Sequence, residues 1–150
     1  MIKLIRTNSA HSGFISLVKE LDAYLELVDG DEHEFYDQYN GIEDLHHVVV
    51  ALHNDSAVAC GAFKAFDTTS VELKRMYCHP DHRNTGIASQ VLQELEKWAS
   101  ELQFQRCILE TGKQQTEALS FYQKNHYRPI PNFGPYTGVA NSFCFEKCLS

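Results

Sequence analysis

The segment from residue 70 to residue 102 constrains the fold more than any other part of the sequence. It begins with "SVELKRMYCHP" (70–80), a strand pattern that ends at a proline. Beyond Gly86, apolar residues recur at three- and four-residue spacing and predict a strong helix: Ile87, Val91, Leu92, Leu95, Trp98, Ala99 and Leu102. A helix that follows such a turn begins with unpaired backbone N–H groups, so the junction favours a bound anion.

The turn between this strand and this helix contains residue types that suit an anion site. Gly86 lets the backbone approach a ligand because it has no Cβ, and Asn84 tolerates left-handed backbone geometry. Arg83 adds a positive charge that can pair with phosphate. Taken alone, the turn is equally compatible with an ordinary helix start. The rival segment "TGKQ" (111–114) lacks the first glycine and the Ser/Thr of a P-loop.

The remaining patterns predict antiparallel strands first, then alternating strands and helices. Further strands are expected at 2–7, 46–53, 57–66, 106–110 and 142–149, and further helices at 12–28 and 116–125. Asn54 and Asp55 mark a hairpin turn between the second and third strands. This order predicts an α/β (α+β) fold with a mixed sheet and helices on both faces. A single domain over residues 1–150 is expected.

The composition argues against several classes of protein. The chain has 150 residues and a formal net charge of −7, which disfavours non-specific nucleic-acid binding and fits a cationic partner. No apolar run is long enough to span a membrane, and the N-terminus lacks a signal-peptide core, so a cytoplasmic location is expected. The five cysteines contain no Cys-x-x-Cys pair and are interpreted as free, mostly buried thiols, with a catalytic cysteine as the minor alternative.

Two segments resemble the signatures of the GNAT acyltransferase superfamily, which binds acetyl-CoA. "RNTGIA" (83–88) is similar to Arg/Gln-x-x-Gly-x-Gly/Ala, and "EALSFYQKNHYRPI" (117–130) is similar to Ala-x-x-x-Tyr-x-Lys-x-Gly-Phe. The chain departs from these patterns at His126 and Tyr127, at Gln115 and at Asn84. The resemblance implies the GNAT fold, a mostly antiparallel sheet of six to seven strands that splays between the fourth and fifth strands.

The resemblance also implies where acetyl-CoA binds. The backbone amides of the turn, Arg83, Asn84, Thr85, Gly86, Ile87 and Ala88, would hold the pyrophosphate. Main-chain groups of Met76 and Cys78 would pair with the pantetheine arm, and the Met76 amide would polarise the thioester carbonyl. Gln115 and Lys124 are further candidate contacts of the cofactor, although Lys124 is equally compatible with a solvated position.

The chemistry of acetyl transfer to an amine calls for a base and an acid. Glu72 lies four residues before Met76, where several family members carry a base, and a carboxylate in a cleft can be tuned for this task by desolvation. The alternative is a solvent-facing Glu72 paired with Lys74, and Glu110 is the competing base. Tyr122 matches the family tyrosine that protonates the leaving thiolate; the alternative is an aromatic core residue.

The acceptor pocket is expected from residues 29–40 and 130–142. The first segment combines Asp31, Glu32, Glu34, Phe35, Tyr36 and Tyr39, which suits a cationic amine or simply forms a solvated acidic cap. Phe133 and Tyr136 are candidate walls in the second segment, whose loop Pro135 would stiffen. No metal site is expected, since His79 and His82 lack a third partner.

The leading hypothesis is therefore an acetyl-CoA-dependent N-acetyltransferase that acts on the primary amine of a small molecule by direct attack in a ternary complex. The alternatives are acetylation of a protein or peptide amine, and a CoA-binding module without catalysis. Exchange through a cysteine is a more remote route. The sequence leaves open the acceptor, the use of other acyl groups and the oligomeric state, although the last strand is expected to offer an edge for a homodimer.

Overall fold

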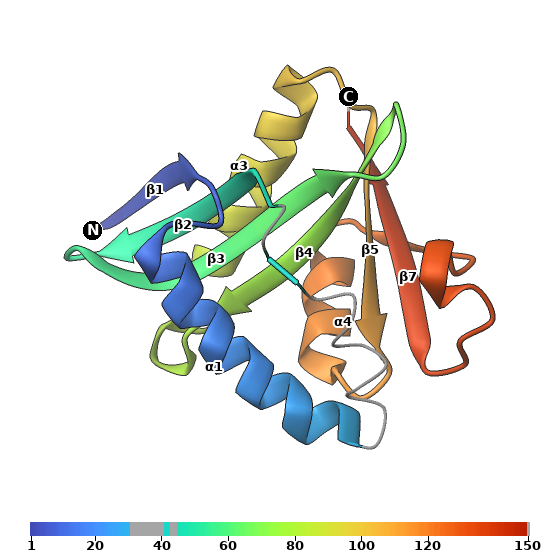
Figure 1. Cartoon of the computed structure of the whole chain (residues 1–150), viewed down its shortest axis with the longest axis horizontal. Coiled ribbons are helices and arrows are strands. Elements are labelled where there is room, and N and C mark those ends of the chain that lie inside the picture. The colour runs from blue at the N-terminus through green and yellow to red at the C-terminus, as the bar shows by residue number, and fades with distance from the viewer. Residues whose placement is uncertain (31–40, 43–44, 150) are drawn as a thin grey trace.

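The computed structural model describes residues 1–30, 41–42 and 45–149. In this part of the chain, seven strands form one sheet in the order β1-β2-β3-β4-β5-β7-β6 (Figure 1). The strands are β1 (Ile2–Thr7), β2 (His47–His53), β3 (Ser56–Ala65), β4 (Ser70–Cys78), β5 (Arg106–Gly112), β6 (Arg128–Ile130) and β7 (Ser142–Cys148). The helices are α1 (Ser12–Asp29), α3 (Ile87–Glu101) and α4 (Thr116–Lys124), with short 3₁₀ turns at Pro80–His82 and Gly134–Tyr136.

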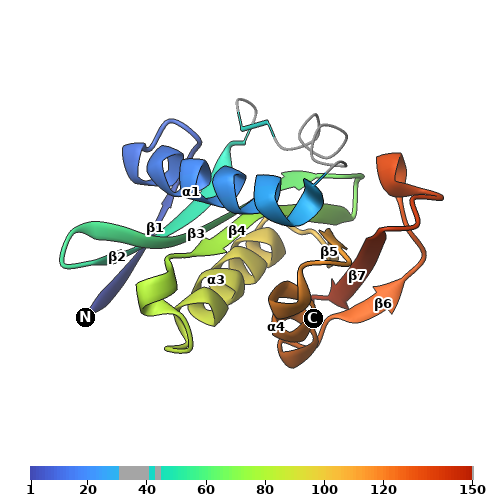
Figure 2. The same ribbon diagram turned by 90° about the horizontal axis from the view of Figure 1, so that it is seen from below.

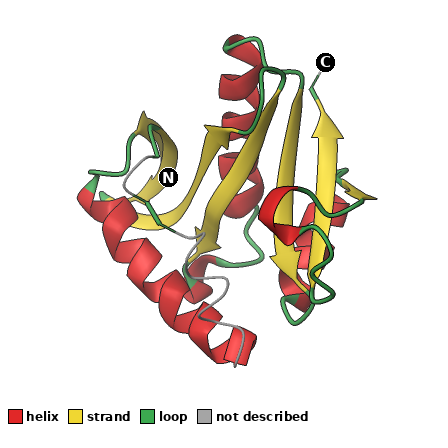
Figure 3. Cartoon of the chain, turned by 45° about the vertical axis from the view of Figure 1, so that its right-hand side comes forward, coloured by secondary structure: helices red, strands yellow, loops and turns green. Residues whose placement is uncertain are grey.

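The sheet is covered by helices on both faces, as predicted. Helix α1 lies on one face, and α3 and α4 lie on the other (Figures 2 and 3). Strand β2 is buried on both sides: Val48 and Val50 pack with Phe14 of α1, whereas Val49 packs with the cluster around α3. Such a strand needs apolar residues at every position, which explains the continuous run "VVVAL" in the sequence. None of the helices in the described ranges is long and apolar enough to cross a membrane.

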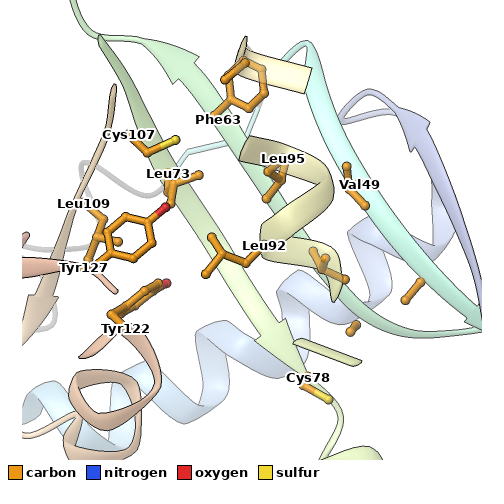
Figure 4. Packing of buried hydrophobic residues seen from close by; sticks show 14 of the residues in the cluster. Val49, Phe63, Leu73, Cys78, Leu92, Leu95, Cys107, Leu109, Tyr122 and Tyr127 are labelled. Atoms are coloured by element: carbon orange, nitrogen blue, oxygen red, sulfur yellow. The ribbon is translucent and has the colours of Figure 1, made fainter. Parts of the chain in front are cut away.

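The core on the α3 face joins the two halves of the sheet. Leu92 and Leu95 of α3 meet Leu73 of β4, and Tyr122 and Tyr127 close the cluster from the C-terminal half (Figure 4). All five cysteines are free, and four of them are buried, in agreement with the sequence-based prediction.

The predicted strands and helices are found close to their expected positions, but β6 was not predicted. Its three residues contain Pro129 and give no readable alternation. Strand β6 pairs with the outer side of β7 from Cys144 to Glu146. The expectation that the last strand offers a free edge is therefore wrong over these residues, because β6 forms the edge of the sheet there.

Strand β4 pairs in parallel with β5 at only three positions, Ser70↔Arg106, Val71↔Cys107 and Glu72↔Ile108. All other neighbouring strands are antiparallel. Beyond Glu72 the two strands diverge, with α4 behind the opening (Figure 1). The predicted splay between the fourth and fifth strands is confirmed.

An ionic cluster holds the paired end of these strands together. Glu146 of β7 accepts hydrogen bonds from Arg106 of β5 at 2.8 Å and from Arg128 of β6 at 2.6 and 2.9 Å. Arg106 also donates to the hydroxyl of Ser70 on β4 at 2.7 Å. These contacts lower the pKa of the Glu146 carboxyl and connect four strands at the end where the sheet is closed.

A β-bulge in β4 changes the direction of the strand close to the point where its pairing with β5 ends. Cys60 pairs with Tyr77 and Ala62 with Lys74, so Arg75 and Met76 together oppose Gly61. Arg75 has a φ of 60°, in the left-handed region that the first residue of a G1-type bulge adopts. Its guanidinium binds the carboxylate of Asp22 on α1. Met76 instead packs over Gly61, where an added Cβ would lie 2.2 Å from its Sδ.

The contact between Met76 and Gly61 predicts that Gly61→Ala destabilises the fold by about 1–3 kcal/mol through overpacking. Urea denaturation measures the effect. In a Met76→Ala background the same substitution should cost less, because the nearest clashing atom is gone and only Leu95 Cδ1, at 2.8 Å, remains too close. An equal cost of Gly61→Ala in both backgrounds would contradict this explanation of the bulge.

Candidate functional site

A groove of about 940 Å³ runs from the β4–α3 turn to α4. It is lined by nearly all the residues that the sequence analysis assigned to the cofactor: Met76, Cys78, Arg83, Asn84, Gly86, Ile87, Ala88, Gln115 and Lys124. Thr85 is the exception, and its hydroxyl donates to the backbone carbonyl of His82 at 2.5 Å. The structure thus brings together residues that are up to 48 positions apart in the sequence, from Met76 to Lys124.

The backbone geometry of the turn is suited to binding an anion. Asn84 (φ 62°) and Gly86 (φ 83°) both adopt the left-handed conformation, as the residue types indicated. Gly86 is the N-cap of α3, so no side chain caps the first N–H groups of this helix. A Cβ built on Gly86 would meet nothing within 4 Å, which means that the turn faces open space.

Arg83 lies across the groove and engages three neighbours. Its Nε donates to the carbonyl of Cys78 at 3.0 Å, its Nη1 lies 3.6 Å from Glu117 on α4, and its guanidinium lies over the ring of Tyr77 at 5.7 Å. The His79 N–H donates to Val58 on β3 at 2.8 Å, so the Cys78 carbonyl of the same peptide unit points the other way, toward the open edge. The main chain of Cys78 is therefore free of β3 and faces the groove.

A second, smaller cavity of about 110 Å³ opens where β4 and β5 separate. It shares five lining residues with the groove: Leu21, Met76, Gln115, Ala118 and Tyr122. The two spaces are therefore neighbours, with Tyr122 and Met76 between them. The other walls of the cavity carry the charged groups Asp29, Glu72, Lys74, Arg75 and Glu110, together with Tyr136.

The two carboxylates proposed as bases both line this cavity but have different partners. Glu72 is buried and forms an ion pair with Lys74 at 3.3 Å. The predicted pairing with Lys74 is present, but the solvent-facing alternative is wrong, because both side chains are only 8% exposed. Burial lowers the pKa of the Lys74 ammonium. Glu110 instead accepts a hydrogen bond from the hydroxyl of Ser142 at 2.7 Å, and burial raises its pKa to about 7.

Tyr122 is buried at the junction of the groove and the cavity. Burial raises the pKa of its phenol above the usual value, which keeps the hydroxyl protonated. Its ring packs edge to face against Tyr127 at 5.6 Å and Phe121 at 5.1 Å. The side chain therefore belongs to the core, as one of the two alternatives predicted, and it also lines both the groove and the cavity.

The aromatic walls predicted for the acceptor pocket are found in part. Tyr136 lines the cavity, whereas Phe133 does not. The ring centre of Phe133 lies 5.9 Å from that of Tyr136 and 5.1 Å from that of Phe66. In the acidic segment 29–40, Asp29 lies in the cavity wall. The expectations for Asp31, Glu32, Glu34, Phe35, Tyr36 and Tyr39 lie outside the described residues.

His79 and His82 of the turn contact other residues of the protein. His79 caps the 3₁₀ turn, since its Nδ1 accepts a hydrogen bond from the Asp81 N–H at 3.1 Å. His82 lies beside His53, with 5.3 Å between their ring centres.

Asp29 and Ser142 fall within the two segments expected to form the acceptor pocket, but the sequence did not single out either residue. Ser142 stands at the start of β7 opposite Gly112, and no motif in the sequence connects it with Glu110. Asp29 is the last residue of α1 and is buried. Only the fold brings these two residues to the carboxylates of β4 and β5.

The fold and the groove are those of an acyltransferase domain, and comparison with known proteins identifies the family. The model of the acetyltransferase (GNAT) family matches residues 14–127. The IAA acetyltransferase of Azospirillum brasilense is 28% identical over 99% of this chain and 98% of its own length. The N-acetyltransferase YsnE of Bacillus subtilis is 32% identical over 66% of this chain and 67% of its own length.

Solved structures agree with this result. A Klebsiella pneumoniae protein assigned as an acyl-CoA N-acyltransferase superposes with a TM-score of 0.83 at 28% identity, covering 100% of this chain and 99% of that one. The PaiA N-acetyltransferase of Thermoplasma acidophilum, solved with coenzyme A, has the same fold with a TM-score of 0.73 at 17% identity, over 99% of both chains. The chain belongs to the GNAT acetyltransferase family, and the predicted class of enzyme, an acetyl-CoA-dependent N-acetyltransferase, is confirmed.

Proposed function

We propose that this enzyme transfers the acetyl group of acetyl-CoA to the primary amine of a small molecule, by direct attack in a ternary complex. The observation that carries the proposal is the junction of two spaces at Tyr122 and Met76. A long groove with an anion-binding turn meets a small cavity lined by carboxylates. Donor and acceptor bound in these two spaces would meet where β4 and β5 separate.

The groove suits the extended shape and the charge of coenzyme A. The N-terminus of α3 and the amides from Arg83 to Ala88 would bind the pyrophosphate, and Lys124 and Gln115 would contact the cofactor from α4. The pantetheine arm would pair with the exposed main chain of Cys78 and continue toward Met76. Arg83 would then exchange its bond to the Cys78 carbonyl for a phosphate. Structures of the same fold have been solved with coenzyme A and with acetyl-CoA bound.

The residues around the junction supply what amide formation needs. The backbone N–H of Met76 would stabilise the negative charge that develops on the thioester oxygen. Tyr122 would give its proton to the departing thiolate, and a carboxylate of the cavity, Glu72 or Glu110, would accept a proton from the amine. The cluster of Asp29, Glu72 and Glu110 would attract an ammonium group, while Leu21, Leu25 and Tyr136 would contact its apolar part.

The proposal is tested with labelled acetyl-CoA, a panel of primary amines and, in parallel, a protein extract. We expect an N-acetylated small amine, detected by mass spectrometry, and release of one CoA thiol per product. Robust labelling of a defined lysine or α-amine of a protein would overturn the small-molecule assignment. Binding of CoA in calorimetry without thiol release with any acceptor would indicate a module without catalysis.

Tyr122→Phe should lower kcat by about a hundredfold or more while the Kd for CoA stays near the wild-type value, because it removes the proton donor and keeps the ring. Tyr127→Phe is the matched control. Its hydroxyl donates to Glu96 of α3 at 2.8 Å and its side chain lines neither the groove nor the cavity, so this variant should lose stability but keep kcat. Equal turnover of Tyr122→Phe and wild type would remove Tyr122 from the mechanism.

A further inference from the structure

The cavity holds two carboxylates whose surroundings prepare them for different tasks. Glu72 and Lys74 stand two residues apart on β4, so their side chains share one face of the sheet. Their ion pair is largely shielded from water, and Glu72 is held there by a full positive charge. The pair therefore fixes Glu72 in the wall of the cavity, next to a positive charge.

Glu110 stands on β5, across the opening from this pair, and accepts a hydrogen bond from a neutral group. The Ser142 hydroxyl donates to Oε2 at 2.7 Å, and Ser142 itself is only 3% exposed. The hydroxyl thereby holds the carboxylate against the start of β7. This hydrogen bond stabilises the charged form far less than an ion pair does.

We propose that Glu110, positioned by Ser142, takes the proton of the acceptor amine, and that Glu72, held by its ion pair with Lys74, attracts the substrate without accepting its proton. Ser142 is a positioning residue in this assignment, since it acts through Glu110. The inference rests on the proposed function and assigns two tasks that the sequence alone left undivided between Glu72 and Glu110.

Protons and electron pairs are conserved in the proposed acetyl transfer. The acceptor arrives as an ammonium and passes one proton to Glu110, which frees the nitrogen lone pair. The nitrogen forms a bond to the thioester carbon, and the C–S bond breaks. The second proton lost on amide formation replaces the one that Tyr122 gives to the thiolate, so the products are an amide, the CoA thiol and one proton that Glu110 releases to water.

The groups around Glu110 set the pH at which this step operates. Burial is the largest effect on the pKa of Glu110, which is raised to about 7. Asp29 of α1 and Glu72 of β4 also raise this pKa, whereas Ser142 and Lys74 lower it. Cys144 of β7 is its cross-strand neighbour. Activity should therefore rise with pH around 7 as the Glu110 carboxylate forms. Removing the Ser142 hydroxyl should move this rise to higher pH, since the bond favours the charged form.

The test combines titration of the free protein with kinetics on the acceptor found in the amine panel. In ¹³C-carboxyl NMR of glutamate-labelled protein, one resonance should titrate near pH 7 and disappear in Glu110→Gln. Glu110→Gln should lower kcat at least about a hundredfold with unchanged Kd for CoA. Ser142→Ala should raise both the NMR midpoint and the kinetic rise by about one pH unit, and Ser142→Thr should restore them.

Glu72→Gln combined with Lys74→Met is the comparison variant, because it removes both charges of the pair together and leaves neither unpartnered. It should raise KM for the amine and keep the pH dependence of kcat, because Glu72 and Lys74 shift the pKa of Glu110 in opposite directions. The assignment is overturned if Glu110→Gln retains the wild-type rate, or if Ser142→Ala lowers the rate without moving its pH dependence. Failure of the proposed function has a different signature: wild-type protein would acetylate no small amine, while the Glu110 resonance would still titrate.

Discussion

The parting of β4 from β5 after three paired residues is the constraint on which the rest of the structure depends. Parallel pairing ends at Glu72, and from there each strand follows a different course. The cluster of Ser70, Arg106, Glu146 and Arg128 fixes the closed end. At the open end the bulge at Arg75 and Met76 turns β4 away, with Gly61 providing the space for Met76. A sheet that is interrupted in this way exposes main-chain groups that would otherwise be paired.

The opening determines where each chemical group of the site can lie. The main chain of Cys78 and the turn that starts α3 face the groove on one side. Alternation along β4 and β5 turns Glu72, Lys74 and Glu110 toward the α1 face, while Leu73 and Leu109 enter the core on the α3 face. Tyr122 reaches the junction from α4. One break in pairing thus produces the groove, the smaller cavity and their point of contact.

The sequence predicted the parts of this arrangement that are local. Strand alternation and helical spacing located all but one of the described strands and all three described α-helices, and residue type correctly indicated the left-handed geometry of Asn84. Strand β6 has three residues and no pattern, so only its pairing with β7 reveals it. The bond between Ser142 and Glu110 spans 32 positions and depends on the register of β5 with β7, which no local signal encodes. The ion pair of Glu72 was foreseen from spacing, but its burial depends on tertiary packing, in which α1 and Tyr136 line the same cavity.

The central claim is that the open edge of β4 and the N-terminus of α3 form the binding surface for the donor. Amide hydrogen exchange, followed residue by residue in the presence and absence of CoA, tests it directly. The structure predicts slower exchange at Cys78 and at the amides from Thr85 to Ala88, with little change in β1 and β2. Unchanged exchange at these amides under saturating CoA, or protection confined to another surface, would contradict the account.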